Sequence, residues 1–174
     1  MKKILVFIAD GSEEIEALTP VDVLRRANVN VDIVSVGKET VTGSHGINIV
    51  ADKPLKETNV NEYDGIVIPG GMPGALNIAA NKKAVNAAIN FAEQGKLVAA
   101  ICAAPAVVLA ANGITDGKKA TCFPAEKFIN AMKNAVYTAS SVEADGNIIT
   151  ANGPRSAIEF ALKICEYLGV TPAF

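Results

Sequence analysis

The sequence predicts an α/β protein in which a mostly parallel sheet is covered by helices on both faces. Strand-length runs such as KKILVFIA, at 2–9, are continuously apolar, as expected of strands buried on both faces. Segments with helical spacing alternate with these runs. The chain has 174 residues, half of them hydrophobic, which is enough to bury such a core as one domain over 1–174.

The first half of the chain opens with the strand at 2–9 and a helix expected at 13–28. Apolar residues such as Leu18 and Leu24 recur there at helical spacing. Pro20 either kinks this helix or restarts it with Thr19 as the cap. The other elements expected in this half are strands at 29–37 and 63–71, a hairpin-like pair at 39–52, and a helix at 82–96 that Gly95 would end.

The second half continues the alternation and ends in an amphipathic helix. The Asp145-Gly146 pair is a good hairpin turn between two of its short strands. In order, we expect a strand at 97–105, a helix at 105–113, a strand at 118–123, a helix at 124–134, strands at 135–140, 141–146 and 147–152, and a helix at 154–169. In a parallel sheet of this kind, ligands bind at the carboxyl ends of the strands.

Composition and charge argue against several classes of partner. The net charge is −2 and no basic tract is present, which disfavours a dedicated nucleic-acid or membrane-surface protein. No apolar stretch is long enough to span a bilayer, and MKKILVFIAD is expected to be a strand rather than an export signal. The three cysteines form neither a disulfide framework nor a metal-binding pattern. We therefore expect a cytoplasmic protein.

Cys102 lies in AAICAAP, where an apolar strand meets a proline. A nucleophile at a strand-to-helix elbow has a strained backbone and needs small neighbours, and Ala100, Ala103 and Ala104 supply them. Pro105 suits the first turn of a helix. Amide groups after Cys102 would then favour the thiolate and depress the pKa of the thiol. The alternative is an inert buried cysteine, which is our expectation for Cys122 and Cys165.

Two other strand ends carry candidate groups. Gly70 and Gly71 allow close approach of backbone to a ligand, so their amides could bind an oxyanion, or they could simply form a tight turn. Glu16 is followed by apolar residues, and burial would raise the pKa of its carboxyl and suit it to proton transfer. A solvated helix charge is the simpler alternative. His45, the only histidine, is expected to have a surface or structural role and gives little support for a Cys–His mechanism.

Four segments together resemble the ThiJ/PfpI superfamily, which has a class I glutamine amidotransferase-like fold, and are nearest its DJ-one-like branch. They are ADGSEEIEALTPVDVLRRA, YDGIVIPGGMPGALN, AAICAAPAVVLA and TANGPRSAIEFALKI, in the expected order and covering nearly the whole chain. The resemblance implies a flavodoxin-like three-layer α/β sandwich, usually a homodimer.

The resemblance also assigns residues. Cys102 matches the family cysteine, and Glu16 matches the glutamate that hydrogen-bonds it. The pocket amides correspond to Gly70, Gly71 and Ala103, whereas two further positions match segments at the dimer side of the site, Pro154 after Gly153, and Arg26. Three residues depart from the pattern of many relatives: Ala103 and Phe123 replace histidines, and His45 replaces an arginine.

Three functions follow from the resemblance. The first is a cofactor-free glyoxalase or protein deglycase, in which Cys102 attacks methylglyoxal or an early glycation adduct and Glu16 moves the proton. Such chemistry would need no metal. The second is an oxidative-stress sensor or redox-controlled chaperone that acts through oxidation of Cys102. The third is a PfpI-type peptidase, which the missing histidine at position 103 disfavours.

Overall fold

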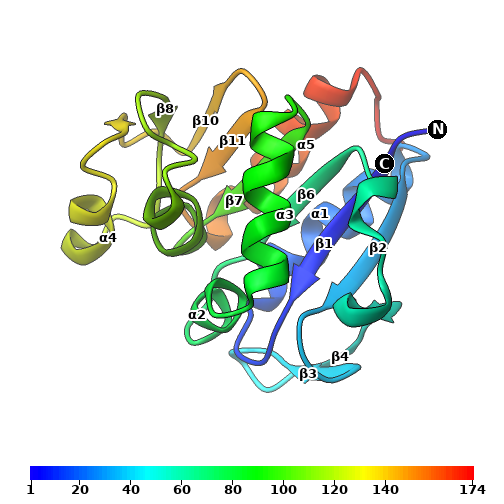
Figure 1. Cartoon of the computed structure of the whole chain (residues 1–174). Coiled ribbons are helices and arrows are strands. Elements are labelled where there is room, and N and C mark those ends of the chain that lie inside the picture. Colours follow the sequence, from blue (N-terminus) through cyan, green and yellow to red (C-terminus); the bar gives the residue numbers. More distant parts are fainter.

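The computed structural model describes all residues, 1–174. Its centre is a seven-stranded sheet in the order β10-β11-β7-β6-β1-β2-β5 (Figure 1). All neighbouring strands are parallel except β10 and β11, which form an antiparallel hairpin. The strands are β1 (Lys3–Ile8), β2 (Asn30–Ser35), β5 (Lys53–Pro54), β6 (Gly65–Ile68), β7 (Leu97–Ile101), β10 (Val142–Asp145) and β11 (Ile148–Ala151).

Helices cover both faces of this sheet, as expected. In Figure 1, α3 crosses in front of the strands, while α1 and α5 lie behind them. Each layer has its own core, one of 27 buried residues that includes α2 and α3, and one of 25 that includes α1 and α5. The helices are α1 (Glu14–Arg26), α2 (Gly74–Ala79), α3 (Lys82–Glu93), α4 (Glu126–Ala131) and α5 (Ala157–Leu168). The protein is thus a flavodoxin-like α/β sandwich.

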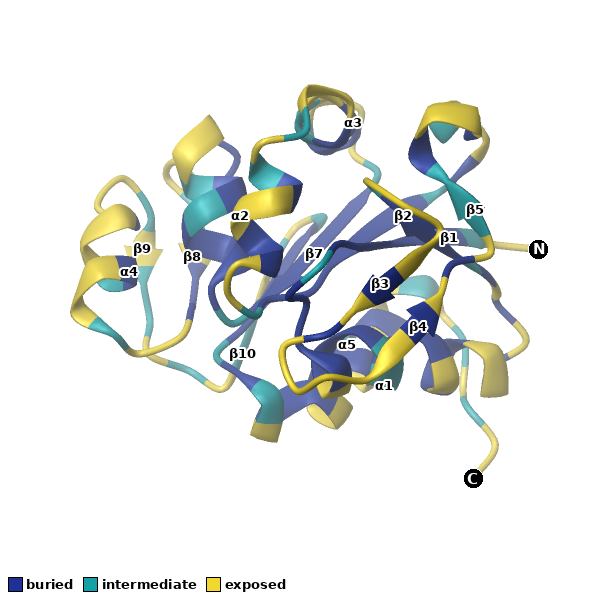
Figure 2. Cartoon of the chain, turned by 90° about the horizontal axis from the view of Figure 1, so that it is seen from below, coloured by how far each residue is buried: buried dark blue, intermediate teal, exposed yellow.

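Two small strand pairs lie outside the main sheet. β3 (Thr40–Thr42) and β4 (Asn48–Val50) form the expected antiparallel hairpin. Figure 2 shows this hairpin beside α1 at the carboxyl end of the sheet. β8 (Lys119–Ala120) and β9 (Val136–Tyr137) pair in parallel next to β10.

The local differences from expectation have physical causes. Pro20 does not divide α1, because Ala17, Val21 and Leu24 on the same helix pack into the core and hold it together. The helix expected at 105–113 is irregular. It consists of a wide turn at Pro105–Leu109 and a tighter one at Ala110–Asn112, and ends at Gly113 with φ 73°.

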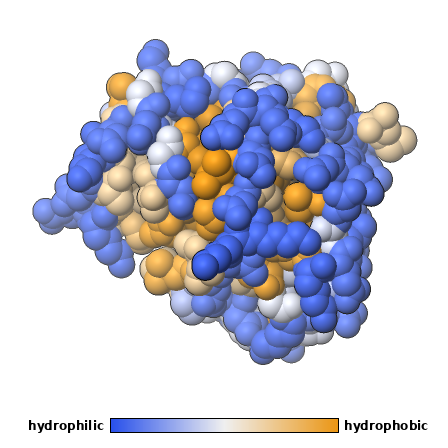
Figure 3. Space-filling view, in the orientation of Figure 1, coloured by the Kyte–Doolittle hydropathy of each residue, from blue (hydrophilic) through white to orange (hydrophobic).

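The face of the molecule seen in Figure 3 is mostly hydrophilic, with hydrophobic residues exposed between the hydrophilic ones. Among the helices, none is both long enough and apolar enough to cross a membrane.

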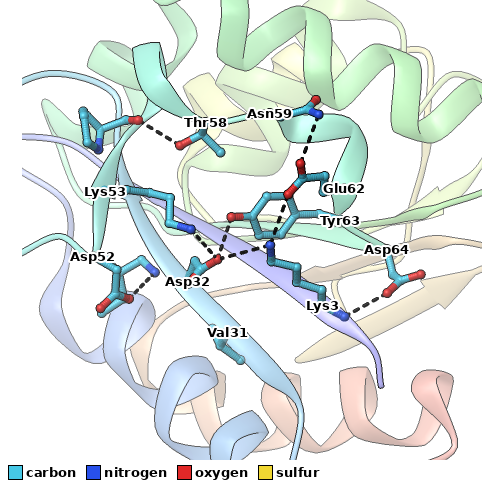
Figure 4. Close-up of polar contacts among 12 residues, drawn as sticks. Lys3, Val31, Asp32, Asp52, Lys53, Thr58, Asn59, Glu62, Tyr63 and Asp64 are labelled. Carbon is cyan, nitrogen blue, oxygen red and sulfur yellow. Dashed lines mark hydrogen bonds and ion pairs between the residues drawn. The ribbon is translucent and has the colours of Figure 1, made fainter.

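A partly buried polar network fixes β2 to the segment before β6 (Figure 4). The Asp32 carboxylate accepts hydrogen bonds from the Tyr63 hydroxyl at 2.6 Å and from the Lys53 ammonium at 3.0 Å. Burial alone would raise the pKa of Asp32, but these two donors outweigh it and hold the pKa below its usual value. Burial, followed by the contact with Asp32, raises the pKa of Tyr63 to about 12.

We expect Asp32→Asn to lower the free energy of unfolding by about 1–3 kcal/mol, because charge-assisted hydrogen bonds become neutral ones. The depressed pKa of Asp32 stabilises the fold above the carboxyl's ordinary pKa of 3.8, and this stabilisation is lost as the pH falls through the folded-state value. The difference should therefore be full at pH 7 and shrink below about pH 4. Urea unfolding at pH 7 and below about pH 4 measures this difference in the free energy of unfolding between wild type and Asp32→Asn. Asp116→Asn, at an exposed position, is the control. Equal losses in the two variants would contradict the role of the network.

The strand order brings three chain segments to one place. β6 lies between β1 and β7, and all three strands are parallel. Their carboxyl ends, visible from below in Figure 2, therefore lie at the same edge of the sheet. The segments that follow them contain Gly11–Glu13, Gly70–Gly71 and Cys102.

Candidate active site

Cys102 directly follows β7 and has a left-handed backbone conformation, with φ 66°. This confirms the strained elbow expected from the sequence. The amide of Cys102 donates to the Ala151 carbonyl at 2.8 Å, so β11 holds the elbow in place. Ala103 and Ala104 are buried, while Cys102 itself is only partly buried. The sulfur is thus held on a rigid turn that small neighbours permit.

Glu16 is fully buried in the first turns of α1. Its Oε2 accepts a hydrogen bond from the Gly70 amide at 2.8 Å, whereas Oε1 is buried without a well-formed hydrogen bond. Burial raises the pKa of this carboxyl to about 7, helped by the charge of Glu13 and opposed by the Cys102 thiol and the Gly70 amide. A carboxyl with this pKa exchanges protons readily at neutral pH.

The expected depression of the Cys102 thiol pKa is wrong. Burial, and then the charge and hydrogen bond of Glu16, raise the pKa of Cys102 to about 12. The amides of Gly71 and Ala103 act in the opposite direction but are outweighed. Near pH 7 the sulfur is therefore a thiol, and the neighbouring carboxylate is the base that can accept its proton.

The two glycines after β6 have different functions. The Gly70 amide is used by Glu16, so it is not free to bind a substrate oxygen as expected. A Cβ at Gly70 would lie 2.6 Å from the Cys102 Cβ and 2.6 Å from Glu16 Oε2, so only glycine allows these two side chains to meet. The Gly71 amide faces the sulfur together with the Ala103 amide. These two N–H groups are the candidates for an oxyanion site.

We expect Gly71→Ala to destabilise the fold by at least about 2 kcal/mol more than Gly95→Ala, because only the first also adds a backbone clash. Both glycines have positive φ, 83° and 71°. A Cβ at Gly71 would lie 2.4 Å from the Glu13 amide nitrogen, whereas one at Gly95 meets nothing within 4 Å. Thermal and urea unfolding would compare the two variants, and equal losses would contradict the close approach of these loops.

Glu13 and Glu14, at the start of α1, have different structural roles. Glu13 caps α1 by accepting the Glu16 amide at 2.8 Å. Glu14 is buried and holds the β3–β4 hairpin, accepting the His45 amide at 2.8 Å while its Oε2 lies 3.0 Å from His45 Nδ1. Burial opposes ionisation of Glu14, but the hydrogen bonds from His45 and Ile47 lower its pKa to about 2. His45 therefore contacts Glu14, and the site contains no Cys–His pair.

The remaining expected residues lie at different distances from Cys102. Pro154 lines a cavity next to Phe123, whose amide donates to the Cys102 carbonyl at 2.7 Å. Arg26 lies at the opposite end of α1 from Glu16, about 15 Å along the helix axis. There it pairs with Asp22 at 3.0 Å and lies over the Phe174 ring. Within one chain, Arg26 does not reach the sulfur.

This combination defines a class: a flavodoxin-like sandwich with a cysteine at the elbow after a central strand and a buried glutamate beside it. The chain belongs to the DJ-1/PfpI family, whose sequence model matches residues 2–167.

Individual relatives agree with this assignment. The chain is 45% identical over 165 residues to protein DJ-1 homolog B of Arabidopsis thaliana, covering 94% of this chain and 37% of that protein. It is 40% identical to the Parkinson disease protein 7 homolog of Danio rerio, covering 96% and 89%. The structure of oxidized Toxoplasma gondii DJ-1 superposes with a TM-score of 0.90 at 42% identity, covering 97% and 91%. The chain spans less than half the length of the plant relatives.

Proposed function

We propose that this protein is a cysteine-dependent glyoxalase or deglycase that acts on methylglyoxal or on early glycation adducts. The observation that carries the proposal is the buried Glu16 carboxyl, with a pKa of about 7, beside a partly exposed thiol on a strained elbow. Family membership supports a function of the DJ-1 kind. The reaction needs a nucleophile, one proton carrier and an oxyanion site, and side chains or amides for all three lie together here.

The first step joins the sulfur to the aldehyde. The thiol proton of Cys102 passes to the Glu16 carboxylate as the sulfur attacks the aldehyde carbon, C1. Amides of Gly71 and Ala103 stabilise the alkoxide that forms, and Glu16 then returns the proton to it. The product is a hemithioacetal.

The second step moves a proton between adjacent carbons. Glu16 removes the C1 proton and the electrons shift to form an enediolate with its charge on the C2 oxygen. The proton of the C1 hydroxyl moves to that oxygen, and Glu16 returns its proton to C2, which gives an α-hydroxy thioester. C1 is oxidised as C2 is reduced, so no external oxidant is consumed. Water then cleaves the thioester and releases lactate and the free thiol, which makes the net reaction methylglyoxal plus water to lactate.

The test is turnover of methylglyoxal in D₂O, followed by proton NMR. We expect lactate carrying deuterium at C2, because the Glu16 proton exchanges with solvent before it returns to carbon. Absence of lactate would overturn the proposed activity. Lactate that retains the original C1 proton at C2 would contradict exchange of the Glu16 proton with solvent. Unchanged lactate formation by Glu16→Gln would remove Glu16 from the second step.

Oxidant sensing is a second candidate, favoured by the same pair of side chains. Two peroxide molecules would convert the sulfur to a sulfinate and yield two waters. Protonated Glu16 would donate to the sulfinate, since a nearby negative charge raises the carboxyl pKa further. One structural relative, Toxoplasma gondii DJ-1, has been solved in an oxidized form. Intact-mass analysis after mild peroxide should show a two-oxygen adduct on Cys102, with the buried Cys122 and Cys165 as internal controls; no adduct at Cys102 would exclude sensing.

We also propose a homodimer that uses the hairpin side of the molecule. Ile15, Ile47 and Val50 are large apolar side chains that are 53–61% exposed. The bonds from Glu14 to the hairpin place these residues on neighbouring segments. Exposed apolar groups gathered in this way are typical of a protein interface. Sedimentation equilibrium should give twice the chain mass, and Val50→Asp should shift the protein toward monomer; a monomeric wild type would overturn the proposal.

A further inference from the structure

A cavity of about 270 Å³ lies beside the elbow and is lined by Phe123, Pro124 and residues 152–156. Both of its walls are attached to the peptide of Cys102. The Phe123 amide donates to the Cys102 carbonyl at 2.7 Å, and the Cys102 amide donates to the carbonyl of Ala151, which directly precedes the other wall, at 2.8 Å. A group held in this cavity therefore lies beside the backbone of Cys102, although Cys102 does not itself line the cavity.

One side of the cavity is apolar and rigid. The Phe123 ring is 40% exposed and packs edge-on against Phe128, with ring centroids 6.4 Å apart. Gly153 lies opposite, and a Cβ there would be 3.5 Å from the ring, so its missing side chain leaves room beside the aromatic face. Pro154 completes this wall. Such a surface suits a flat apolar group, because aromatic rings pair well by offset stacking or edge contact.

The other side of the cavity is polar and cationic. Arg155 is exposed and forms no ion pair with any acidic side chain of the protein. The side-chain Oδ1 of Asn152 accepts a hydrogen bond from the Ser156 hydroxyl at 2.6 Å, which leaves the side-chain NH₂ of Asn152 as a donor. No carboxylate lines the cavity. A guanidinium and an amide donor together are suited to binding a carboxylate.

We propose that this cavity binds the body of an electrophilic substrate, namely an aryl group that ends in a carboxylate, while its carbonyl meets Cys102. The volume is sufficient, since a cavity of roughly 150 Å³ already holds benzene. Phe123 and Arg155 are then the residues that determine specificity. This proposal rests on the proposed function in that the same sulfur reacts, but its test requires no turnover.

The test measures alkylation of Cys102 by three iodoacetamides that differ only in what they carry. They are iodoacetamide, its N-phenyl derivative, and the N-(4-carboxyphenyl) derivative. In each case the sulfur forms the new carbon bond, iodide leaves and the thiol proton is released. Rates from intact mass and peptide mapping are divided by the rates with glutathione, which corrects for intrinsic reactivity. We expect the phenyl probe to react at least about fivefold faster than iodoacetamide after correction, and the carboxyphenyl probe about threefold faster again.

Variants separate the two walls. Phe123→Ala should remove the phenyl preference while iodoacetamide still reacts, and Arg155→Gln should remove only the carboxylate preference. Phe174→Ala, which removes an exposed ring far from the cavity, should change neither. Equal corrected rates for all three probes, or no labelling of Cys102, would overturn the proposal. Preference for the aryl probes without lactate formation would reject the glyoxalase activity and support aryl binding in the cavity. Lactate formation without that preference would support the glyoxalase activity and reject aryl binding in the cavity.

Discussion

Cys102→Ser is expected to abolish formation of lactate from methylglyoxal, with a loss of at least about a thousandfold in kcat/KM. A serine hydroxyl is far less acidic and less nucleophilic than a thiol, and the elbow holds no histidine to activate it. The substitution is nearly isosteric, and residue 102 keeps its backbone bond to Ala151. The loss should therefore occur without any large change in the free energy of unfolding.

The measurement is lactate production by repurified wild type, Cys102→Ser and Cys122→Ala. Cys122→Ala removes a buried thiol from a residue that does not have the left-handed backbone conformation of Cys102, so it serves as the matched control. It should retain activity. Equal rates in wild type and Cys102→Ser would remove Cys102 from the mechanism, whatever the activity of the control.

Glu16→Gln is expected to reduce turnover at pH 7 by about a hundredfold, the ordinary contribution of a positioned base. In the wild type the carboxyl retains its proton up to a pKa of about 7, so the rate should rise as the pH passes through 7 and the carboxylate forms. In Glu16→Gln, this rise in the rate near pH 7 should disappear. Activity should then rise only where the thiol itself ionises, at a pKa below the wild-type value of about 12, because the charge and hydrogen bond of Glu16 that raise it are gone.

The same variant should also change the dependence of stability on pH. A carboxyl whose pKa is raised from 4.5 to about 7 on folding stabilises the fold fully below pH 4.5, and this contribution is lost as the pH rises through 7. Glutamine does not titrate, so Glu16→Gln should gain about 3 kcal/mol relative to wild type between pH 4.5 and 8. Denaturant unfolding at the two pH values, with the exposed Glu39→Gln as control, measures this gain. A pH-independent difference would show that Glu16 is not buried as a titrating acid.

The sequence was sufficient to predict a mostly parallel sheet covered by helices and to predict the elbow, but not the order of the strands in the sheet. Apolar runs followed by helical spacing predict the parallel sheet, and the alanines around Cys102 predict its unusual backbone. These are local properties that a short stretch of chain determines. Without the family resemblance, the position of Glu16 opposite the sulfur could be anticipated only as one of two alternatives, because the register of α1 against β6 depends on the whole core.

The remaining features depend on packing between distant segments. The high thiol pKa at Cys102 arises from burial and from Glu16, 86 positions away in the chain (102 minus 16). The use of the Gly70 amide by Glu16, and the cavity between Phe123 and Gly153, likewise require contacts that no local pattern encodes. Glu14 lies at the start of α1, and a hairpin some 30 residues later (|i−j| = 31 for His45) surrounds it.

The hydrogen bond from the Cys102 amide to Ala151 has a consequence for synthesis of the chain. β11 is the last strand of the main sheet to leave the ribosome, and β7 has no neighbour on that side until it arrives. A nascent chain that already exposes the cysteine therefore lacks the support for its elbow conformation. The elbow can therefore take its final shape only after β11 has been made and has paired with β7, so the geometry of this nucleophile depends on residue 151, which is 49 positions later in the chain (151 minus 102).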